Sequence, residues 1–449
     1  MADLAVNFCG IKSSNPFWLA SAPPTNTGDQ VMRAFDAGWG GAVWKTVGNP
    51  IVNVASRLGS VDYHGQKMMG LSNIELISDR PLADNLREMS FVKKRYPKSV
   101  VIASLMAETK DDWRVLIKRC EDAGVDGLEL NFGCPHGMCE RGMGSSVGQE
   151  PKLIQRITSW VKEFAQTPVL VKLTPNVGDI VEPALAAVAG GADGISLINT
   201  IQSIVSVDLE RLVPNPRVGH ASSHGGYSGP AIKPIALHMV AALARDSRIP
   251  IPISGIGGIS NWRDTAEFVA LGATSVQVCT AVMHHGYRII EDMIEGLSNY
   301  LDNKGLTSLG ELRGRGTSAY QEWGDLDLCY AHVASIDPLS CIGCQLCVTA
   351  CHDGGHQCIF TGPQDHARPS HSRVPGIAKA PNPLPLGKLA GDRVPWIDEP
   401  QCVGCNLCQL VCPVSGCITM AEVPQSRHDT WNDRTREGRD HVPGGIHDT

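Results

Sequence analysis

The chain has 449 residues, which is enough for a large core and a second domain. Hydrophobic residues make up 43% and charged residues 19%, an ordinary composition for a soluble globular protein, and the formal net charge of -7 argues against a general nucleic-acid binder. The N-terminus shows no secretory signal and no segment is apolar for long enough to cross a membrane, so we expect a cytoplasmic protein.

Short apolar runs alternate with amphipathic stretches from the N-terminus to about residue 285. Each run is bounded by Gly, Pro or a polar cluster, as expected for a strand that is buried on both faces. The predicted strands are residues 17–20, 41–45, 100–105, 127–131, 169–173, 194–199, 251–254 and 275–279. The clearest predicted helices are residues 111–123, 151–164, 180–189, 232–244 and 262–271.

Eight strand–helix units favour a parallel (β/α)8 TIM barrel, although periodicity alone would also fit an open doubly wound sheet. A barrel requires polar residues to collect at the C-terminal ends of its strands, where active sites of this fold lie. For any single residue, capping of a strand is the simpler explanation, but the pattern recurs at most of the strands. The polar positions are Ser21, Lys45, Thr46, Asn131, Lys172, Asn199, Thr200, Cys279 and Thr280, with a glycine turn at residues 255–258.

A glycine-rich stretch follows the fourth predicted strand, from residue 131 to residue 149. It contains Cys134, His136 and Cys139 among five glycines, which is typical of a mobile loop that holds a thiol over a pocket. A flexible connection with an incidental cysteine would have the same composition.

Two cysteine runs near the C-terminus share the spacing C-x2-C-x2-C-x3-C. This is the bacterial ferredoxin pattern, in which three thiolates of one run hold a cubane and the fourth reaches the other cluster. Structural zinc sites favour two C-x-x-C pairs instead, and a disulfide framework is a poor explanation in a chain without a secretory signal. The pattern therefore predicts two 4Fe-4S clusters, one held by Cys341, Cys344, Cys347 and Cys412 and the other by Cys402, Cys405, Cys408 and Cys351.

The first run is followed by His352 where the second has Pro413, and a long insertion separates the runs. These departures leave the exchange of the fourth ligand open, although two clusters are expected either way. Cys358 and Cys417 lie just outside the runs and are expected to be buried free thiols.

The predicted domains are a barrel over residues 1–310, a connection over 311–334, a ferredoxin-like domain over 335–422 and a polar tail over 423–449. The ferredoxin-like domain contains an insertion at 361–395 that is rich in Pro, Gly and His and is expected to lack regular structure. The tail is expected to be disordered or to contact a partner.

Two clusters only relay electrons, so another centre is needed for the chemistry. The turn Gly255-x-Gly257-Gly258 lacks the full dinucleotide fingerprint, but a glycine turn after the seventh strand of a barrel suits a single phosphate. FMN carries one phosphate and needs a cation near its N1–C2=O edge, for which Lys172 is well placed.

Several longer motifs point to one family. They are Asn15-Pro16-Phe17, Leu19-Ala20-Ser21-Ala22, Lys45-Thr46, Asn73-Ile74-Glu75-Leu76-Ile77-Ser78, Cys134-Pro135-His136-Gly137-Met138, Glu140-Arg141-Gly142-Met143-Gly144, Lys172-Leu173-Thr174-Pro175-Asn176, Asn199-Thr200, Gly225-Gly226, Ser228-Gly229 and Gly257-Gly258. With the two ferredoxin runs after them, the chain resembles the catalytic subunits of bacterial NAD-dependent dihydropyrimidine dehydrogenases. The resemblance covers residues 15–420, and dihydroorotate dehydrogenases share only part of the motifs.

The resemblance implies a set of binding residues. FMN would be bound by Ser21, Lys45, Thr46, Lys172, Gly229, Gly257, Gly258, Cys279 and Thr280. Uracil or thymine would be held by Asn73, Asn131, Phe132, Gly133, Asn199 and Thr200. Amides suit this task because a pyrimidine edge alternates N–H donors with carbonyl acceptors and Asn offers both.

The resemblance also assigns Cys134 as the proton donor. A thiol whose pKa lies not far above neutral can give its proton to C5 of the base while a hydride reaches C6 from the opposite face. Cys139 is a rival by composition, and His136 could tune the thiol or cap the loop. The residue before the thiol is Gly133, where the animal enzyme carries Ser, and the change could alter base preference.

The expected activity is reversible reduction of uracil or thymine to the 5,6-dihydro base at FMN. NADH would be oxidised on a separate FAD-bearing subunit, and its electrons would pass through the two clusters. We also expect a barrel-mediated dimer. The alternatives are a dihydroorotate dehydrogenase-like enzyme with a fused ferredoxin module and a non-catalytic electron-transfer protein.

Overall fold

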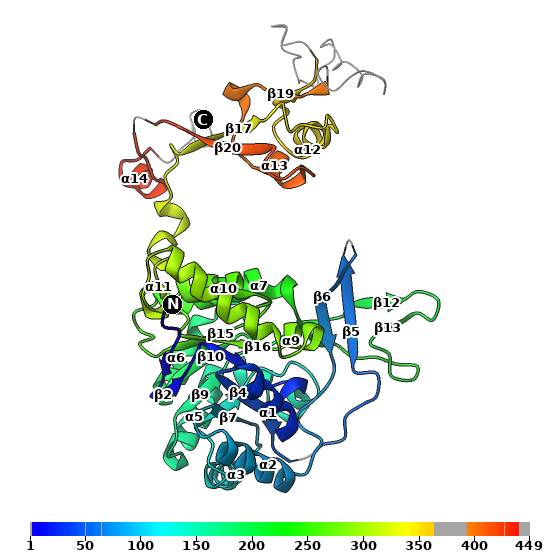
Figure 1. The fold of residues 1–449 in the computed structure, drawn as a ribbon, viewed down its shortest axis with the longest axis vertical. Coiled ribbons are helices and arrows are strands. Elements are labelled where there is room, and N and C mark those ends of the chain that lie inside the picture. The colour runs from blue at the N-terminus through cyan, green and yellow to red at the C-terminus, as the bar shows by residue number, and fades with distance from the viewer. Residues whose placement is uncertain (1, 50, 64, 363–392, 426, 440–449) are drawn as a thin grey trace. The chain divides into compact units, whose positions relative to one another are not determined.

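The computed structural model describes residues 2–49, 51–63, 65–362, 393–425 and 427–439 (Figure 1). It divides into two compact units, Met1–Tyr320 and Gln321–Thr449. Most of the insertion predicted at 361–395, and the last ten residues of the predicted tail, lie outside the described residues. No helix in the described part of the chain has both the length and the apolar character that spanning a membrane requires.

The first unit is built on a closed barrel of parallel strands, so the predicted fold class is confirmed. The strands are β3 (Phe17–Leu19), β4 (Gly41–Val47), β7 (Val100–Leu105), β8 (Gly127–Asn131), β9 (Val169–Lys172), β10 (Gly194–Leu197), β15 (Ile253–Ile256) and β16 (Ser275–Val278). The barrel strands pair in the order in which they occur along the chain, and the last barrel strand, β16, pairs with the first, β3.

Helices follow the strands and surround the barrel (Figure 1). Threonine or asparagine side chains cap the first turns of several of them, as Asn261 does for α8. The helices are α1 (Gly28–Ala37), α2 (Leu82–Arg95), α3 (Lys110–Asp122), α5 (Pro151–Phe164), α6 (Val181–Ala189), α7 (Lys233–Arg245), α8 (Trp262–Ala270) and α10 (Ile289–Asn303), with short α4 (Ser145–Gly148), α9 (Thr280–His285) and α11 (Leu309–Leu312).

The predicted bounds agree closely with the structure for most elements. Those of β7, β8 and α5 are identical to the prediction. The seventh strand was predicted at 251–254 but runs from Ile253 to Ile256, because Pro250 and Pro252 have no N–H to donate to a strand ladder.

A group of short strands was not predicted. The sheet β11-β14-β6-β5 comprises β11 (Ile201–Ser203), β14 (Gly225–Ser228), β6 (Gln66–Asn73) and β5 (Leu58–Tyr63), and a separate hairpin comprises β12 (Ser206–Asp208) and β13 (Val213–Asn215). Their largely polar sequence gives a weak strand signal. The sheet brings Asn73, at the end of β6, opposite Gly226 of β14, which adds residues distant from the barrel strands to the site.

The opposite end of the barrel is covered by the N-terminal hairpin of β1 (Val6–Phe8) and β2 (Ile11–Ser13). Phe8 and Ile11 pack there with Trp18, Ile102 and Leu170, all buried. This packing leaves the C-terminal strand ends as the open side of the fold.

The second unit is small and is organised around cysteines. The antiparallel pair β17 (Ala331–Ile336) and β20 (Ile418–Val423) and the pair β18 (Ile359–Phe360) and β19 (Trp396–Ile397) accompany α12 (Leu346–Gly354) and α13 (Leu407–Val411). Its core consists mainly of buried cysteines with Ala334, Ile359 and Ile418. The region predicted as a polar tail contains a further helix, α14 (Trp431–Arg436), whose Trp431 ring lies 5.8 Å from that of Trp323.

The last barrel strands depend on a glycine for their helix packing. A Cβ on Gly255 of β15 would lie 2.5 Å from the Phe268 ring of α8. We therefore expect Gly255→Ala to reduce stability by roughly 1–3 kcal/mol through overpacking. Gly178→Ala is the matched control, since no atom lies within 4 Å of its added Cβ. Urea denaturation measures both, and equal midpoints for the two variants would contradict this packing.

Candidate active site and cluster cavities

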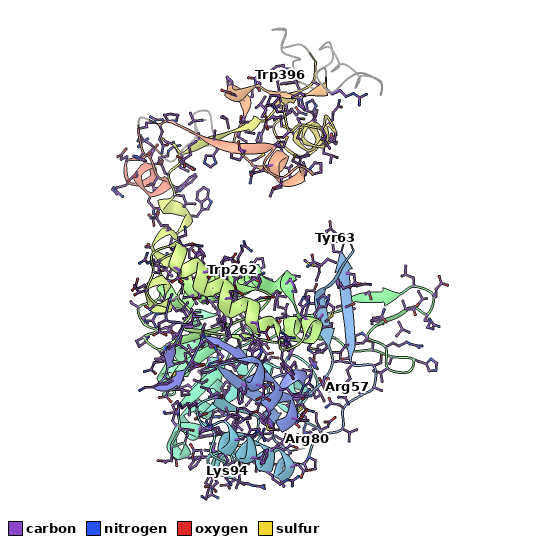
Figure 2. The ribbon with its side chains drawn as sticks, in the orientation of Figure 1. Arg57, Tyr63, Arg80, Lys94, Trp262 and Trp396 are labelled. Carbon is purple, nitrogen blue, oxygen red and sulfur yellow. The ribbon has the colours of Figure 1, made fainter. Side chains whose placement is uncertain are left out.

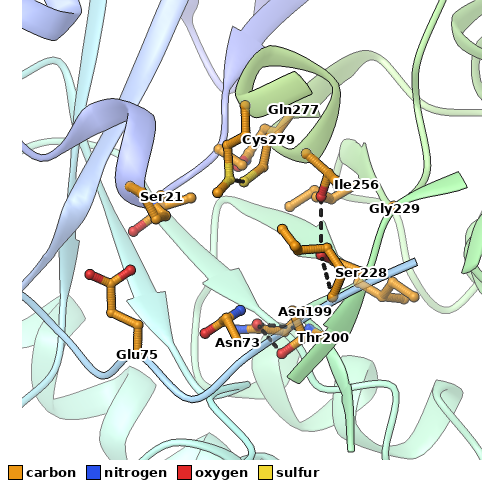
Figure 3. Close-up of a pocket in the computed structure, with 18 of the residues that line it drawn as sticks. Ser21, Asn73, Glu75, Asn199, Thr200, Ser228, Gly229, Ile256, Gln277 and Cys279 are labelled. Atoms are coloured by element: carbon orange, nitrogen blue, oxygen red, sulfur yellow. Dashed lines mark hydrogen bonds between the residues drawn. The ribbon is translucent and has the colours of Figure 1, made fainter. Parts of the chain in front are cut away.

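One cavity opens at the C-terminal ends of the barrel strands and holds about 1130 Å³, its open mouth included. The predicted site residues line it except Phe132 and Gly133. Figure 3 shows Asn73, Asn199 and Thr200 gathered together, with Ser21 and Cys279 elsewhere on the wall. The barrel therefore brings together positions that lie more than 200 residues apart in the sequence.

The polar residues on one wall form a continuous hydrogen-bonded chain. The Asn131 Nδ2 donates to Thr46 Oγ1 at 3.0 Å, and the Asn199 Nδ2 donates to Asn131 Oδ1 at 3.1 Å. Thr46 Oγ1 also shares hydrogen bonds with Ser21 Oγ at 3.1 Å and Ser104 Oγ at 2.9 Å. These bonds fix the orientation of two amides in advance of any ligand, which lowers the entropic cost of binding.

Asn73 differs from the other two asparagines. Among the described residues its side-chain amide has no hydrogen-bond partner, although it lines the cavity. An amide carries both donors and acceptors, so Asn73 is available to pair with a polar ring edge. It comes from the unpredicted sheet, where its backbone faces Gly226.

Glu75 lines the cavity but was not among the predicted site residues, although it lies in one of the motifs shared with the family. Its carboxylate accepts a hydrogen bond from Lys45 Nζ at 2.6 Å and another from Arg57 at 2.8 Å. Arg57 lies on the segment that leads into β5 (Figure 2). The motif could have indicated a site role for Glu75, because it places an acidic residue between the apolar residues Ile74 and Leu76.

Lys172 lies at the end of β9 with its side chain only 6% exposed. Its Nζ is 3.8 Å from Glu129 Oε1, which is too long for a hydrogen bond, and it has no closer partner among the described residues. Glu129 is fully buried, and its other oxygen accepts from Gln277 Nε2 at 2.9 Å. Lys172 thus carries a charge that is balanced at a distance while its N–H donors face the cavity.

The glycine turn after β15 lines the cavity and packs closely against the rest of the barrel. Gly257 and Gly258 have φ of 129° and 73°, a region that favours glycine. A Cβ on Gly257 would lie 2.8 Å from the Ala236 Cβ, and one on Gly258 would lie 3.0 Å from the Gly229 carbonyl oxygen. These contacts show that glycine lets the turn pack closely against α7. The turn and Lys172 both line the cavity, and a backbone turn beside an amine suits a phosphate-bearing flavin.

Cys134 lines the cavity on the loop after β8 and is 9% exposed. Its Sγ donates to the His136 carbonyl oxygen at 3.5 Å. Burial raises the pKa of the Cys134 thiol to about 12, although the backbone of His136 and the charge of Lys172 act in the opposite direction. The sequence led us to expect a pKa not far above neutral, and the structure differs because desolvation of the thiolate outweighs the causes that lower the pKa.

The loop around Cys134 is packed rather than exposed. Met138 and Met143 are buried with Cys134 against Ile77 and Met106. Added Cβ atoms on two of its glycines would collide with the backbone carbonyl oxygens of Cys134 and Phe132, at 2.6 Å for Gly144 and 2.0 Å for Gly148. These glycines allow close packing of the loop, which the glycine count alone could not distinguish from mobility.

His136 and Cys139 have structural contacts on this loop. The His136 Nε2 is 3.0 Å from the Glu75 carbonyl oxygen, its Nδ1 is buried without a partner, and burial lowers its pKa. Cys139 Sγ donates to the Cys134 carbonyl oxygen at 2.9 Å and contacts Ser145 Oγ at the same distance. Cys139 does not line the cavity, so the geometry favours Cys134 over its rival.

Phe132 and Gly133 contribute to the site indirectly. Phe132 is 1% exposed and packs edge-on against Trp113 of α3, because its side chain turns outward where that of Asn131 turns inward. An added Cβ at Gly133 would lie 2.3 Å from the Asn199 Cβ. Gly133 therefore provides room for Asn199, and a serine there would require Asn199 to move.

Each predicted set of four cluster ligands lines one cavity in the second unit. Cys341, Cys344, Cys347 and Cys412 line the first, and Cys351, Cys402, Cys405 and Cys408 line the second. The cavities thus group the cysteines as the spacing predicted, with the fourth cysteine exchanged. No group of three or more His, Cys, Asp or Glu in the described ranges is arranged around a single metal ion, as a zinc site would require. The cavities suit the larger 4Fe-4S cubane, and the ligand assignment stays a prediction.

Both units of the chain match known protein families. A family model described as dihydroorotate dehydrogenase matches residues 3–301, and one described as 4Fe-4S dicluster domain matches residues 334–420. The chain is 41% identical over 423 residues to the NAD-dependent dihydropyrimidine dehydrogenase subunit PreA of Escherichia coli, covering 94% of this chain and 96% of the relative.

Two further relatives cover mainly the barrel. A chloroplastic dihydropyrimidine dehydrogenase (NADP(+)) of Arabidopsis thaliana is 41% identical over 337 residues, which is 72% of this chain and 79% of the relative. The catalytic subunit of dihydroorotate dehydrogenase B (NAD(+)) of Pyrococcus abyssi is 37% identical over 315 residues, which is 69% of this chain and 98% of the relative.

The chain belongs to the dihydroorotate dehydrogenase family and, within it, to the dihydropyrimidine dehydrogenase subunits that carry a two-cluster ferredoxin domain. The predicted oxidoreductase is thereby confirmed as an enzyme of the dihydropyrimidine dehydrogenase type. FMN and 4Fe-4S clusters are its cofactors, as predicted.

The Lys172–Glu129 pair predicts a measurable effect on the flavin. Replacing Glu129 by Gln removes a buried negative charge 3.8 Å from the Lys172 amine and keeps a side chain of the same shape for Gln277 to contact. We expect the reduction potential of bound FMN to rise, because the site becomes more positive and favours the reduced anion. Lys172→Met should lower the potential. A redox titration followed by flavin absorbance measures both, and a lower potential in Glu129→Gln would contradict the assigned charge balance.

Proposed function

We propose that this chain reduces uracil or thymine to the 5,6-dihydro base, with electrons relayed through its two clusters from an NADH-oxidising, FAD-bearing partner subunit. The observation that carries the proposal is the set of neutral amides beside a buried thiol: Asn73, Asn131 and Asn199 share one cavity with Cys134. A pyrimidine base is neutral and presents alternating donors and acceptors, which amides can match without a charged ligand.

The cavity's charges favour a neutral base over dihydroorotate, which carries a carboxylate. The cations that line the cavity in the described ranges are Lys45 and Lys172, and each faces a carboxylate of this chain. His136 is held neutral by burial. Glu75 already pairs with Lys45 and Arg57, so a substrate carboxylate would have to compete with a carboxylate of the chain for these cations.

Lys172 and the glycine turn are proposed to hold the cofactor. Gly257 and Gly258 line the cavity and would hold the phosphate through the backbone of their turn, and the Lys172 amine would stabilise negative charge on the reduced ring. When bound, FMN supplies hydride chemistry. The protein's own residues then orient the base, exclude water and supply the proton.

Cys134 is proposed to give its proton to C5 of the base. At the raised pKa of about 12 the thiol is protonated at neutral pH, which is the form that an acid needs. Asn131 and Asn199 hold the ring in register with the loop, because Asn131 Oδ1 also accepts a hydrogen bond from the Gly133 N–H at 3.2 Å. The same loop therefore positions both the acid and the amide contacts.

Replacement of Cys134 tests this role. We expect Cys134→Ala to lower the rate of pyrimidine reduction roughly 100-fold or more, the usual contribution of a positioned acid. Cys139→Ser is the matched control on the same loop, since a hydroxyl can still donate to the Cys134 carbonyl. The measurement is steady-state turnover by the complex with its reductase. A wild-type rate in Cys134→Ala would show that another group supplies the proton.

The pH dependence gives the same assignment a second test. The protonated thiol is required for reduction and its pKa is raised to about 12, so Cys134 causes no loss of reduction as pH rises from about 7 to about 9. Oxidation of the dihydro base needs the thiolate, and its rate should increase with pH over that range. A fall in reduction with a midpoint near neutral that disappears in Cys134→Ala would contradict the buried-thiol assignment.

A further inference from the structure

The internal repeat of the second unit includes more than the eight predicted ligands. The two runs read Cys-Ile-Gly-Cys-Gln-Leu-Cys and Cys-Val-Gly-Cys-Asn-Leu-Cys, and each is followed by a fifth cysteine directly before a strand. Cys358 precedes β18 and Cys417 precedes β20. They are 4% and 2% exposed, and each lines one cluster cavity, Cys358 the second and Cys417 the first. Each cavity therefore has five cysteines where a cubane needs four.

Cys358 contacts one of the assigned ligands directly. Its Sγ lies 3.7 Å from the Cys351 Sγ, and its backbone N–H donates to the same sulfur at 3.3 Å. Two sulfurs in van der Waals contact cannot bind two different irons of one cubane, whose corners point away from one another. With Cys351 as the iron ligand, the shared hydrogen bond therefore runs from the Cys358 thiol to the Cys351 thiolate.

Cys417 occupies the corresponding position of the repeat but has a different partner. Its Sγ donates to the Asp337 carbonyl oxygen at 3.8 Å. In the first cavity the Cys341 sulfur accepts a backbone N–H from Gly343 at 3.4 Å. The Cys351 sulfur thus has a backbone donor and a thiol donor, whereas the Cys417 thiol donates to a carbonyl and also lies close to the sulfurs of Cys341 and Cys412 in the first cavity.

We propose that Cys358 is a positioning residue whose thiol hydrogen bond to Cys351 raises the reduction potential of the cluster held by Cys351, Cys402, Cys405 and Cys408. The inference rests on the proposed ligand assignment. Reduction adds negative charge to a cluster and its thiolates, and hydrogen bonds to those sulfurs stabilise that charge.

The test uses the full chain with both clusters loaded. Iron per chain and an EPR-monitored redox titration are measured for the wild type, Cys358→Ala, Cys358→Ser and Cys417→Ala. We expect full iron in all four proteins and a lower potential for one of the two clusters in Cys358→Ala. Cys358→Ser should restore most of the shift because a hydroxyl also donates. Cys417→Ala should leave that cluster's potential unchanged, since Cys417 lines the other cavity.

Two results would overturn the inference in different ways. Unchanged potentials in Cys358→Ala with full iron would show that the thiol does not influence the cluster, while the ligand assignment stands. Loss of about half of the iron in Cys358→Ala, but not in Cys351→Ala, would make Cys358 the ligand and contradict the assignment itself. An equal shift in Cys417→Ala would show a general effect of removing a nearby thiol.

Discussion

Closure of the barrel is the constraint on which the site depends. Parallel strands that pair in sequence order must all end at the same rim of the barrel. Closure of the barrel alone therefore places residues that are far apart along the chain next to one another. Ser21 follows the first barrel strand and Thr280 the last, yet both line one cavity. The covered N-terminal end, where Phe8 and Trp18 pack, leaves this rim as the place for chemistry.

The polar groups at the rim are of two kinds, neutral amides and charged side chains. The amides of Asn131 and Asn199 are fixed by hydrogen bonds and carry no charge, whereas the two lysines face carboxylates of the same chain. Such a wall discriminates by hydrogen-bond pattern, and a pattern of buried donors and acceptors rejects a mismatched ligand strongly because unpaired groups remain. Cys134 is held beside this wall by a loop whose packing also keeps its thiol protonated.

Much of this arrangement could be predicted from the sequence, and the exceptions have physical reasons. Strands buried on both faces are recognisable as apolar runs, and ligand spacing in a short cysteine motif is a local property of the sequence. The barrel and both sets of cysteines could therefore be predicted from the sequence. Glu75 was missed because its partners Lys45 and Arg57 come from other segments. Phe132 was assigned to the substrate through the family resemblance, but the alternation of side chains along an extended segment turns it into the core.

The central claim is that the cavity accepts a neutral pyrimidine and excludes a charged one. The most direct test compares dihydrouracil and dihydroorotate as substrates of the purified complex, with reduction of bound flavin as the readout. The account predicts rapid flavin reduction by dihydrouracil and none by dihydroorotate at the same concentration. Reduction by dihydroorotate alone would contradict it and would make the chain a dihydroorotate dehydrogenase with a fused ferredoxin module.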